Sequence, residues 1–288
     1  MVRRIIQALT ALLYNIHLKG FITGRIYQGS LKKVCVPGLN CYSCPGAVGS
    51  CPIGSLQSSI NTVKYKVSFY VAGLLILFGS ILGRFICGWM CPFGLVQEML
   101  YKIPSRKLRK KPVFGVFKYG KYVILAVFVL LLPVLYSLQK GVTIPAFCKY
   151  ICPAGTLEAG VPLVALNESL RYTIGWLFYW KMLLLAAMVL SAAFIYRPFC
   201  RFICPLGAIY AMFNSIAVFG LKVDSAKCTR CGICTGACKV DIHPFDMPND
   251  PECVRCGDCV KACPHRALKF GNIYTDTPYT SRNMAQNQ

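Results

Sequence analysis

The chain has 288 residues and a formal net charge of +22, and 56% of its residues are hydrophobic. A mean hydropathy of +0.52 excludes an ordinary soluble domain. Only three of the ten acidic residues precede residue 222, so the apolar part of the chain is also its most basic part. This combination is typical of a membrane protein with cationic flanks, and no nucleic-acid partner is expected.

Four apolar stretches predict membrane-spanning helices. They are residues 5–24, 67–83, 122–139 and 176–196. The last three can each cross a hydrocarbon core of about 30 Å, whereas the first contains polar residues and is the weakest. Pro133 is expected to kink the third helix. A further apolar run, residues 205–220, is too short to span and predicts an interfacial or re-entrant helix.

The distribution of Lys and Arg predicts the orientation. Residues 101–121 contain eight Lys and Arg, which is the strongest cytoplasmic signal in the chain. With four spans, the N-terminus and the part after the fourth span then also lie on the cytoplasmic side. Residues 25–65 and 140–173 face outward, although basic residues in the first of these loops argue against it. The predicted location is the inner (cytoplasmic) membrane, crossed several times.

Four loops repeat the motif C-P-x-G, and three of them carry another Cys four residues earlier. The motifs begin at Cys51, Cys91, Cys152 and Cys204, and the earlier cysteines are Cys87, Cys148 and Cys200. Pro ends one helix and suits the first position of the next, which places Cys at the helix N-cap. Backbone N–H groups and the positive helix end then face the thiolate or an anionic cluster, while Gly allows close packing.

These motifs divide the membrane part into two parallel repeats, residues 1–111 and 112–220, each with the order span, loop, span, loop. The loops alternate sides, so we expect one cluster near each surface. The inner ligands are Cys87, Cys91, Cys200 and Cys204. The outer ligands are Cys44, Cys51, Cys148 and Cys152, with Cys41 as the alternative to Cys44 and Cys35 left over. Zinc sites, disulfides in the outer loop and plain buried thiols are the alternatives.

The stretch from Cys228 to Cys263 contains two runs of C-x-x-C-x-x-C-x-x-x-C, the spacing of a bacterial ferredoxin with two [4Fe-4S] clusters. The last Cys of each run is expected to bind the other run's cluster. The two ligand sets are Cys228, Cys231, Cys234 and Cys263, and Cys253, Cys256, Cys259 and Cys238. Gly232 and Gly257 lie inside the runs, where the backbone must turn tightly. Zinc does not need triple runs, and a disulfide does not easily close a two-residue loop.

The motifs together resemble a known family. Residues 39–57, 83–94 and 200–207, followed by the double run, resemble the NapH-type membrane polyferredoxins, which are relatives of the C-terminal part of NosR-type proteins. The resemblance implies iron–sulfur clusters and four membrane helices. It also implies an association with quinol oxidation and with electron supply to reductases or maturation systems.

The predicted fold is an α-helical membrane protein with about four transmembrane helices in two parallel repeats, followed by a small α+β ferredoxin domain with two clusters. The predicted domains are residues 1–220 and 221–272, with a polar tail at 273–288. Two [4Fe-4S] clusters are expected in the ferredoxin domain and two more in the membrane domain.

The predicted function is electron transfer across the membrane, between the cytoplasmic ferredoxin-like domain and a quinone pool or an extracytoplasmic redox partner. The alternative is an electron donor for the maturation of a reductase's cofactor or metal centre. The chain is expected to be a subunit of a larger oxidoreductase complex, and its own quinol dehydrogenase activity is left open. No catalytic residue is predicted. Glu98 is expected to be solvated or paired with a lysine, and Lys181 to extend to the membrane interface or to face an anionic cluster.

Overall fold

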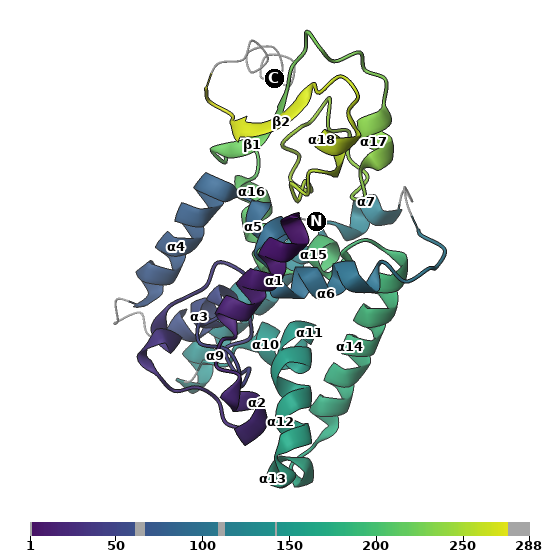
Figure 1. Cartoon of the computed structure of the whole chain (residues 1–288). Coiled ribbons are helices and arrows are strands. Elements are labelled where there is room, and N and C mark those ends of the chain that lie inside the picture. Colours follow the sequence, from purple (N-terminus) through teal and green to yellow (C-terminus); the bar gives the residue numbers. More distant parts are fainter. Residues whose placement is uncertain (1, 61–66, 109–112, 142, 276–288) are drawn as a thin grey trace.

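The computed structural model describes residues 2–60, 67–108, 113–141 and 143–275, so nearly all of the predicted polar tail lies outside the described residues. Helices build the chain as far as residue 213, and a unit with two strands follows (Figure 1). The helices of the first half are α1 (Val2–Tyr14), α2 (Lys19–Thr23), η1 (Ser30–Lys33), α3 (Pro52–Ser59), α4 (Val67–Leu82), α5 (Phe85–Trp89) and α6 (Pro92–Leu100).

The second half repeats this alternation of longer helices with short helices at the cysteine loops. Its helices are α7 (Val113–Phe117), α8 (Gly120–Ile124), η3 (Leu125–Leu131), α9 (Leu132–Lys140), α10 (Ala146–Tyr150), α11 (Pro153–Gly155), η4 (Thr156–Gly160), α12 (Val161–Leu166), α13 (Glu168–Tyr172), α14 (Trp176–Phe194), α15 (Pro198–Phe202) and α16 (Pro205–Phe213). The C-terminal unit, residues 219–275, contains β1 (Phe219–Val223), α17 (Ile233–Ala237), α18 (Asp258–Ala262) and β2 (Leu268–Asn272).

Two helical runs of the described chain are long and apolar enough to cross a membrane, namely Phe114–Lys140 and Trp176–Phe194. They correspond to the predicted spans at 122–139 and 176–196. The helix predicted at 67–83 is present as α4, but its 16 residues extend only about 24 Å at the helical rise of about 1.5 Å per residue. Helix length in the described residues therefore supports two spans and does not establish the predicted four.

The predicted N-terminal span at 5–24 is not one helix. α1 ends at Tyr14, and the chain turns before α2 begins at Lys19. The side chain that follows α1 is held at this turn, because Asn15 Nδ2 donates to Asn40 Oδ1 at 2.9 Å. A polar contact with a distant loop thus ends the helix after 13 residues, about 20 Å.

The kink expected at Pro133 takes the form of a π-helical stretch, η3, directly before the proline. Proline has no N–H, and its ring collides with the carbonyl four residues earlier in a regular helix. A wider turn relieves this collision. The π-helical η4 precedes Pro162 in the same way. The second half therefore has a π-helical stretch before a proline at two places.

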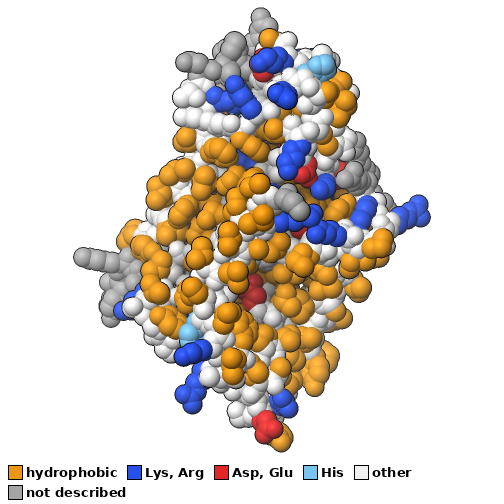
Figure 2. All heavy atoms as spheres, viewed as in Figure 1, with side chains coloured by type: hydrophobic (Ala, Val, Ile, Leu, Met, Phe, Trp, Pro, Cys, Tyr) orange, Lys and Arg blue, Asp and Glu red, His pale blue; other side chains and the backbone are white. Residues whose placement is uncertain are grey.

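The helices present apolar side chains to their surroundings. In α1 the buried Gln7 and Thr10 are polar, whereas Ile5, Leu9 and Leu13 are all more than half exposed. Figure 2 shows hydrophobic side chains spread over the visible face of the body below the C-terminal unit. Soluble proteins rarely expose so much contiguous apolar surface. Together with the two long apolar helices, this surface indicates membrane localisation.

The C-terminal unit forms one end of the molecule, the start of α1 and α7 lie next to it, and α2, α12 and α13 lie at the opposite end (Figure 1). α7 belongs to the basic segment 101–121. The three parts that were predicted to share the cytoplasmic side therefore share one end of the structure.

α16 is a buried helix within residues 205–220, and the predicted interfacial or re-entrant position of this segment stays a prediction. Its residues Leu206, Ala208 and Tyr210 are at most 2% exposed. It packs against α3, α4 and α8, so both halves of the chain contact it. The apolar run is explained by this central position.

The C-terminal unit is α+β. β1 pairs antiparallel with β2, with Leu221 opposite Phe270. α17 and α18 pack against each other. Because β1 follows α16 and α4 also contacts β1, the unit is joined to the helical body at more than one point.

Candidate metal centres

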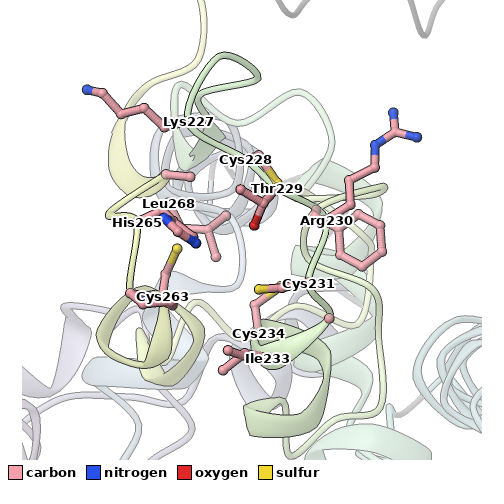
Figure 3. Close-up of a pocket in the computed structure, with 14 residues that line it drawn as sticks. Lys227, Cys228, Thr229, Arg230, Cys231, Ile233, Cys234, Cys263, His265 and Leu268 are labelled. Atoms are coloured by element: carbon pink, nitrogen blue, oxygen red, sulfur yellow. The ribbon is translucent and has the colours of Figure 1, made fainter.

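The C-terminal unit contains a pocket lined by all four cysteines of the first predicted set. They are Cys228, Cys231, Cys234 and Cys263. Figure 3 shows the side chains of Cys231 and Cys263, which come from different runs, around this pocket. Cys263 therefore lies with the first run, although it ends the second. Cys231 is exposed, which places this set at the surface of the molecule.

A separate pocket in the same unit is lined by the second predicted set. These cysteines are Cys238, Cys253, Cys256 and Cys259. The crossed arrangement is reciprocal, because Cys238 comes from the first run. Gly232 and Gly257 turn the backbone within each run at φ values of 76° and 82°. Glycine adopts this left-handed conformation without strain, so the predicted tight turns are confirmed.

The four C-P-x-G motifs have the local structure predicted for them. Each Cys is the N-cap of a helix whose first turn contains the Pro, in α3, α6, α11 and α16. The backbone N–H of Gly155 donates to Cys152 Sγ and that of Gly207 to Cys204 Sγ, both at 3.4 Å. The helix ends therefore direct N–H groups at thiols, which stabilises negative charge on sulfur.

The four predicted inner cysteines lie together and are all buried. Burial raises the pKa of the Cys204 thiol, and the neighbouring Cys200 and Cys87 raise it further. Burial also raises the pKa of Cys91, with added contributions from the same two neighbours. Such effects require the thiols to be near one another. Both C-x-x-x-C pairs therefore lie in one place, within the same buried core.

In the outer set, Cys41 and not Cys44 lies beside the other cysteines. A Cβ atom on Gly155 would lie 3.6 Å from Cys41 Sγ and 3.8 Å from Cys152 Sγ. Burial raises the pKa of the Cys152 thiol well above its usual value, and three further thiols add to this effect. They are Cys148, Cys41 and Cys51. Burial raises the pKa of the Cys44 thiol, and its main side-chain contributions come from Glu158, which raises the pKa, and Lys32, which lowers it.

All eighteen cysteines fall within the described residues and are free thiols. They include Cys35, Cys41 and Cys44, for which disulfides were an alternative. Cys35 is buried, and its backbone forms an isolated β-bridge with Ser50, next to Cys51. Among the described residues, no group of three or more His, Cys, Asp or Glu side chains is placed to hold a single metal ion.

Two glutamines, each six residues after a C-P-x-G cysteine, connect the two halves of the chain. Gln97 Oε1 accepts from the backbone N–H of Phe199 at 3.1 Å. Gln57 Oε1 accepts from the backbone N–H of Phe147 at 3.0 Å. Each Phe directly precedes a predicted ligand, so each glutamine fixes a ligand segment of the other half.

The corresponding positions of the second half also reach the first half. Glu158 Oε2 accepts from the backbone N–H of Cys41 at 2.6 Å, and Tyr210 Oη donates to the Pro37 carbonyl at 2.9 Å. Burial raises the pKa of Glu158 to about 7, and the hydrogen bond from Cys41 opposes this shift. All four motifs are therefore tied to the opposite half at the same position.

Two buried arginines beside the inner cysteines each donate a hydrogen bond to the cysteine loop of the other half. Arg84 precedes Cys87 by three residues, and its Nη2 donates to the Cys200 carbonyl at 2.9 Å. Arg197 precedes Cys200 by three residues, and its Nη1 donates to the Cys87 carbonyl. Both side chains are fully buried. Their charges therefore act on the inner thiols through a poorly screened environment.

Glu98 is buried at 4% exposure, so the expectation that it is solvated or paired with a lysine is wrong. It forms ion pairs with Arg197 at 2.7 Å and with Arg3 at 3.0 Å. Tyr196 Oη also donates to Glu98 Oε1 at 2.6 Å. Glu98 thereby fixes the guanidinium that contacts the inner cysteine loop.

A second buried carboxylate links the helical body to the C-terminal unit. Glu252, next to Cys253, accepts from Arg84 at 2.9 Å and also pairs with Lys121. Burial alone would raise the pKa of the Glu252 carboxyl, but Arg84 and Lys121 hold it below its ordinary value. Glu252 therefore carries a negative charge between two cations.

The backbone of the inner cysteine loop touches the backbone of the C-terminal unit. A Cβ atom on Gly88 would lie only 2.1 Å from the Val254 carbonyl oxygen. Trp89 Nε1 donates to the Arg255 carbonyl at 2.9 Å beside this contact. Gly88 follows Cys87 and Val254 follows Cys253, so the loops of two different cysteine sets meet here.

The donor sets fit iron–sulfur clusters. Each holds four thiols, the ligand type and number of a [4Fe-4S] cluster. Each of the two C-terminal sets lines one pocket. An N–H group donates to a thiol in each set of the helical body, and the buried Arg84 and Arg197 lie at the inner set, as an anionic group requires.

Comparison with known proteins agrees with this chemistry. Three segments of the helical body match the family described as "4Fe-4S binding domain", at residues 67–111, 122–161 and 176–223. A second family with the same description matches residues 249–269. The matches contain all inner cysteines and the second run of the C-terminal unit.

Three relatives indicate the family to which the chain belongs. An uncharacterized protein of Methanocaldococcus jannaschii is 30% identical over 67% of this chain and 74% of its own length. The regulatory protein NosR of Pseudomonas aeruginosa is 30% identical over 61% of this chain and 22% of its own length. The ferredoxin-type protein NapH of Haemophilus influenzae is 26% identical over 58% of this chain and 52% of its own length. The chain belongs to the NapH/NosR-type family of ferredoxin-like membrane proteins.

The NapH/NosR-type chain spans about half of NapH and about a fifth of NosR. Its 4Fe-4S matches and its ferredoxin-type relatives indicate an iron–sulfur protein that takes part in electron transfer. No solved structure matches the chain.

Proposed function

We propose that the protein carries electrons across the membrane between a redox partner at the C-terminal unit and a quinone or second redox partner at the opposite end. Four [4Fe-4S] clusters, one for each cysteine set, would supply one-electron chemistry when bound. The chain supplies their positions, the N–H groups that face the ligand sulfurs, and the buried cations that balance their charge.

The contact between Gly88 and Val254 supports this proposal most directly. Electron tunnelling falls steeply with distance, so two clusters that exchange electrons need ligand loops in close contact. The missing side chain at Gly88 allows the inner loop to touch the loop that begins at Cys253. The ion pair between Arg84 and Glu252 holds the same two loops together.

The outer cluster is assigned to Cys41 in place of Cys44. The proposed ligands are Cys41, Cys51, Cys148 and Cys152. The Cys41 backbone is held by Glu158, and Lys181 Nζ donates to the Cys148 carbonyl at 3.1 Å. Cys44 and Cys35 are left as buried thiols in this assignment.

The inner cluster lies between Arg84 and Arg197. A [4Fe-4S] core with a charge of +2 and four thiolates carries roughly −2 in total, because the charge of the metal must be counted. Burying such a charge without cations would be unfavourable. The two guanidinium groups donate to carbonyls of Cys87 and Cys200 and supply that compensation.

The end that carries the C-terminal unit is assigned to the cytoplasm. This end also carries the basic segment 101–121, and Lys and Arg accumulate in cytoplasmic loops of membrane proteins. Cys231 is exposed there, so the pocket in Figure 3 is the proposed site at which a soluble redox protein approaches.

The iron and acid-labile sulfide content of the anaerobically purified chain tests the proposal. We expect about sixteen of each per chain, since four clusters each hold four irons. A Cys87→Ser variant should retain about twelve and should lose electron transfer from one membrane face to the other. About eight irons in the unmodified chain, or full transfer in the variant, would contradict the proposal.

The ligand assignment in the outer set has its own test. We expect Cys41→Ser to lower the iron content from about sixteen to about twelve, because each cluster needs its fourth thiolate. Cys44→Ser, three residues further along the same loop, is the matched control and should leave the iron content unchanged. The reverse result would restore Cys44 as the ligand.

A further inference from the structure

Gln97 makes three hydrogen bonds that fix its side chain beside the inner cysteines. Its Oε1 accepts from the backbone N–H of Phe199 at 3.1 Å. Its Nε2 donates to the Phe93 carbonyl at 3.2 Å and to Cys200 Sγ at 3.2 Å. The side chain is 1% exposed, so water does not compete for these bonds.

Gln57 makes the same three contacts beside the outer cysteines. Its Oε1 accepts from the backbone N–H of Phe147 at 3.0 Å. Its Nε2 donates to the Ile53 carbonyl at 3.2 Å and to Cys148 Sγ at 3.6 Å. This side chain is fully buried as well.

The backbone partners determine which end of each amide faces the sulfur. The N–H of Phe199 requires an acceptor, and the carbonyl of Phe93 requires a donor. A reversed amide would set oxygen against oxygen and N–H against N–H. The end that points at Cys200 Sγ is therefore the NH₂ group, and the same reasoning holds for Gln57 and Cys148.

We propose that Gln97 and Gln57 are positioning residues that raise the reduction potentials of the inner and outer membrane clusters, respectively. Each aligns a ligand segment of the opposite half through its acceptor and donates an N–H to a ligand sulfur. This inference rests on the proposed function, because it requires that Cys200 and Cys148 bind clusters.

The sign of the effect follows from charge. Reduction adds one electron, and the negative charge on the ligand sulfurs grows. A hydrogen bond to a charged acceptor strengthens as that charge grows, so the N–H stabilises the reduced form more than the oxidised form. Hydrogen bonds to the sulfurs are one of the factors that set the potential of an iron–sulfur cluster.

The inner cluster should respond more strongly than the outer one. The Nε2 to Sγ distance is 3.2 Å at Gln97 and 3.6 Å at Gln57. Both partners of the shorter bond are buried, whereas Cys148 is partly exposed. The shorter and drier bond contributes more electrostatic stabilisation.

A redox titration of the anaerobically purified full chain, reduced stepwise with dithionite and followed by electron paramagnetic resonance, tests this inference. Gln97→Met keeps the side-chain length and removes the N–H donor. We expect one cluster component to need a more negative potential, with about a tenfold lower ratio of reduced to oxidised cluster at a fixed potential, which is about 59 mV for one electron. Gln57→Met is the matched variant and should shift a different component by less.

Each outcome decides the inference. Unchanged midpoints in both Met variants at wild-type iron content overturn it, and so does a shift of the same component by both. If Gln97→Met loses its cluster, Gln97→Glu keeps the acceptor for the Phe199 N–H, and it should restore the iron while the midpoint stays low. A wild-type midpoint in Gln97→Glu that persists at a pH where the carboxyl is ionised overturns the donor role, because only the protonated carboxyl can donate to Cys200 Sγ. Only eight irons in the wild-type chain would instead refute the proposed function.

Discussion

A Gly88→Ala variant is expected to loosen the C-terminal unit from the helical body and to slow electron exchange between them. The added Cβ would lie 2.1 Å from the Val254 carbonyl oxygen and 3.3 Å from its carbonyl carbon. Backbone atoms must move to admit it, and overpacking of this kind costs about 1–3 kcal/mol. The displaced contact is the one that joins the loops of two cysteine sets, so the distance that electrons must cross grows.

The measurement has two parts. Limited proteolysis should release the C-terminal unit of Gly88→Ala more readily, and a reduced donor that reacts at the exposed Cys231 face should reduce the membrane clusters more slowly. Gly73→Ala is the matched control, because a Cβ at Gly73 meets nothing within 4 Å. Wild-type rates in Gly88→Ala at normal iron content would show that electrons do not use this contact.

The features that sequence predicted well depend on local chemistry. A Pro after Cys fixes the start of a helix wherever the motif occurs, so all four C-P-x-G cysteines are N-caps. The two runs between Cys228 and Cys263 line pockets, because a Cys at every third residue of a short loop can surround one compact site. The crossed positions of Cys238 and Cys263 also follow from that spacing.

The features that sequence predicted poorly depend on distant partners. Glu98 pairs with Arg197 and Arg3, and neither arginine can be recognised as its partner from the neighbouring residues. The polar side chain of Gln7 made the N-terminal segment look like a weak span, yet it faces inward and donates to the Gly88 carbonyl.

Cys41 and Cys44 could not be separated by spacing either, because both lie in one irregular loop. The tie between Glu158 and the Cys41 backbone distinguishes them, and it joins residues 117 positions apart. Some signals were nevertheless present in the sequence. C-P-x-G-x-x-Q occurs at Cys51 and Cys91, and R-x-x-C occurs at Arg84 and Arg197. Aligning the two halves with each other marks the arginine pattern, and aligning the two C-P-x-G loops of the first half marks the glutamine pattern.

A Glu98→Ala variant is expected to lower the stability of the helical body by about 3–5 kcal/mol, because removing one partner leaves buried charges uncompensated. The guanidinium of Arg197 is fully buried and that of Arg3 is mostly buried, and both lose their carboxylate. Arg197 also donates to the Cys87 carbonyl, so the inner cysteine loop should be disturbed together with the ion pair.

Thermal unfolding of the detergent-solubilised chain measures this effect, with iron retention on heating as a second readout. Asp224→Asn is the matched control, because solvent screens the ion pair of Asp224 with the exposed Lys227, and Asn keeps the oxygen that accepts from the Ala226 N–H. The control should unfold as the wild type does, while Glu98→Ala should unfold at a clearly lower temperature and release iron earlier. Equal unfolding of both variants would mean that the buried network around Glu98 contributes no more than a surface ion pair.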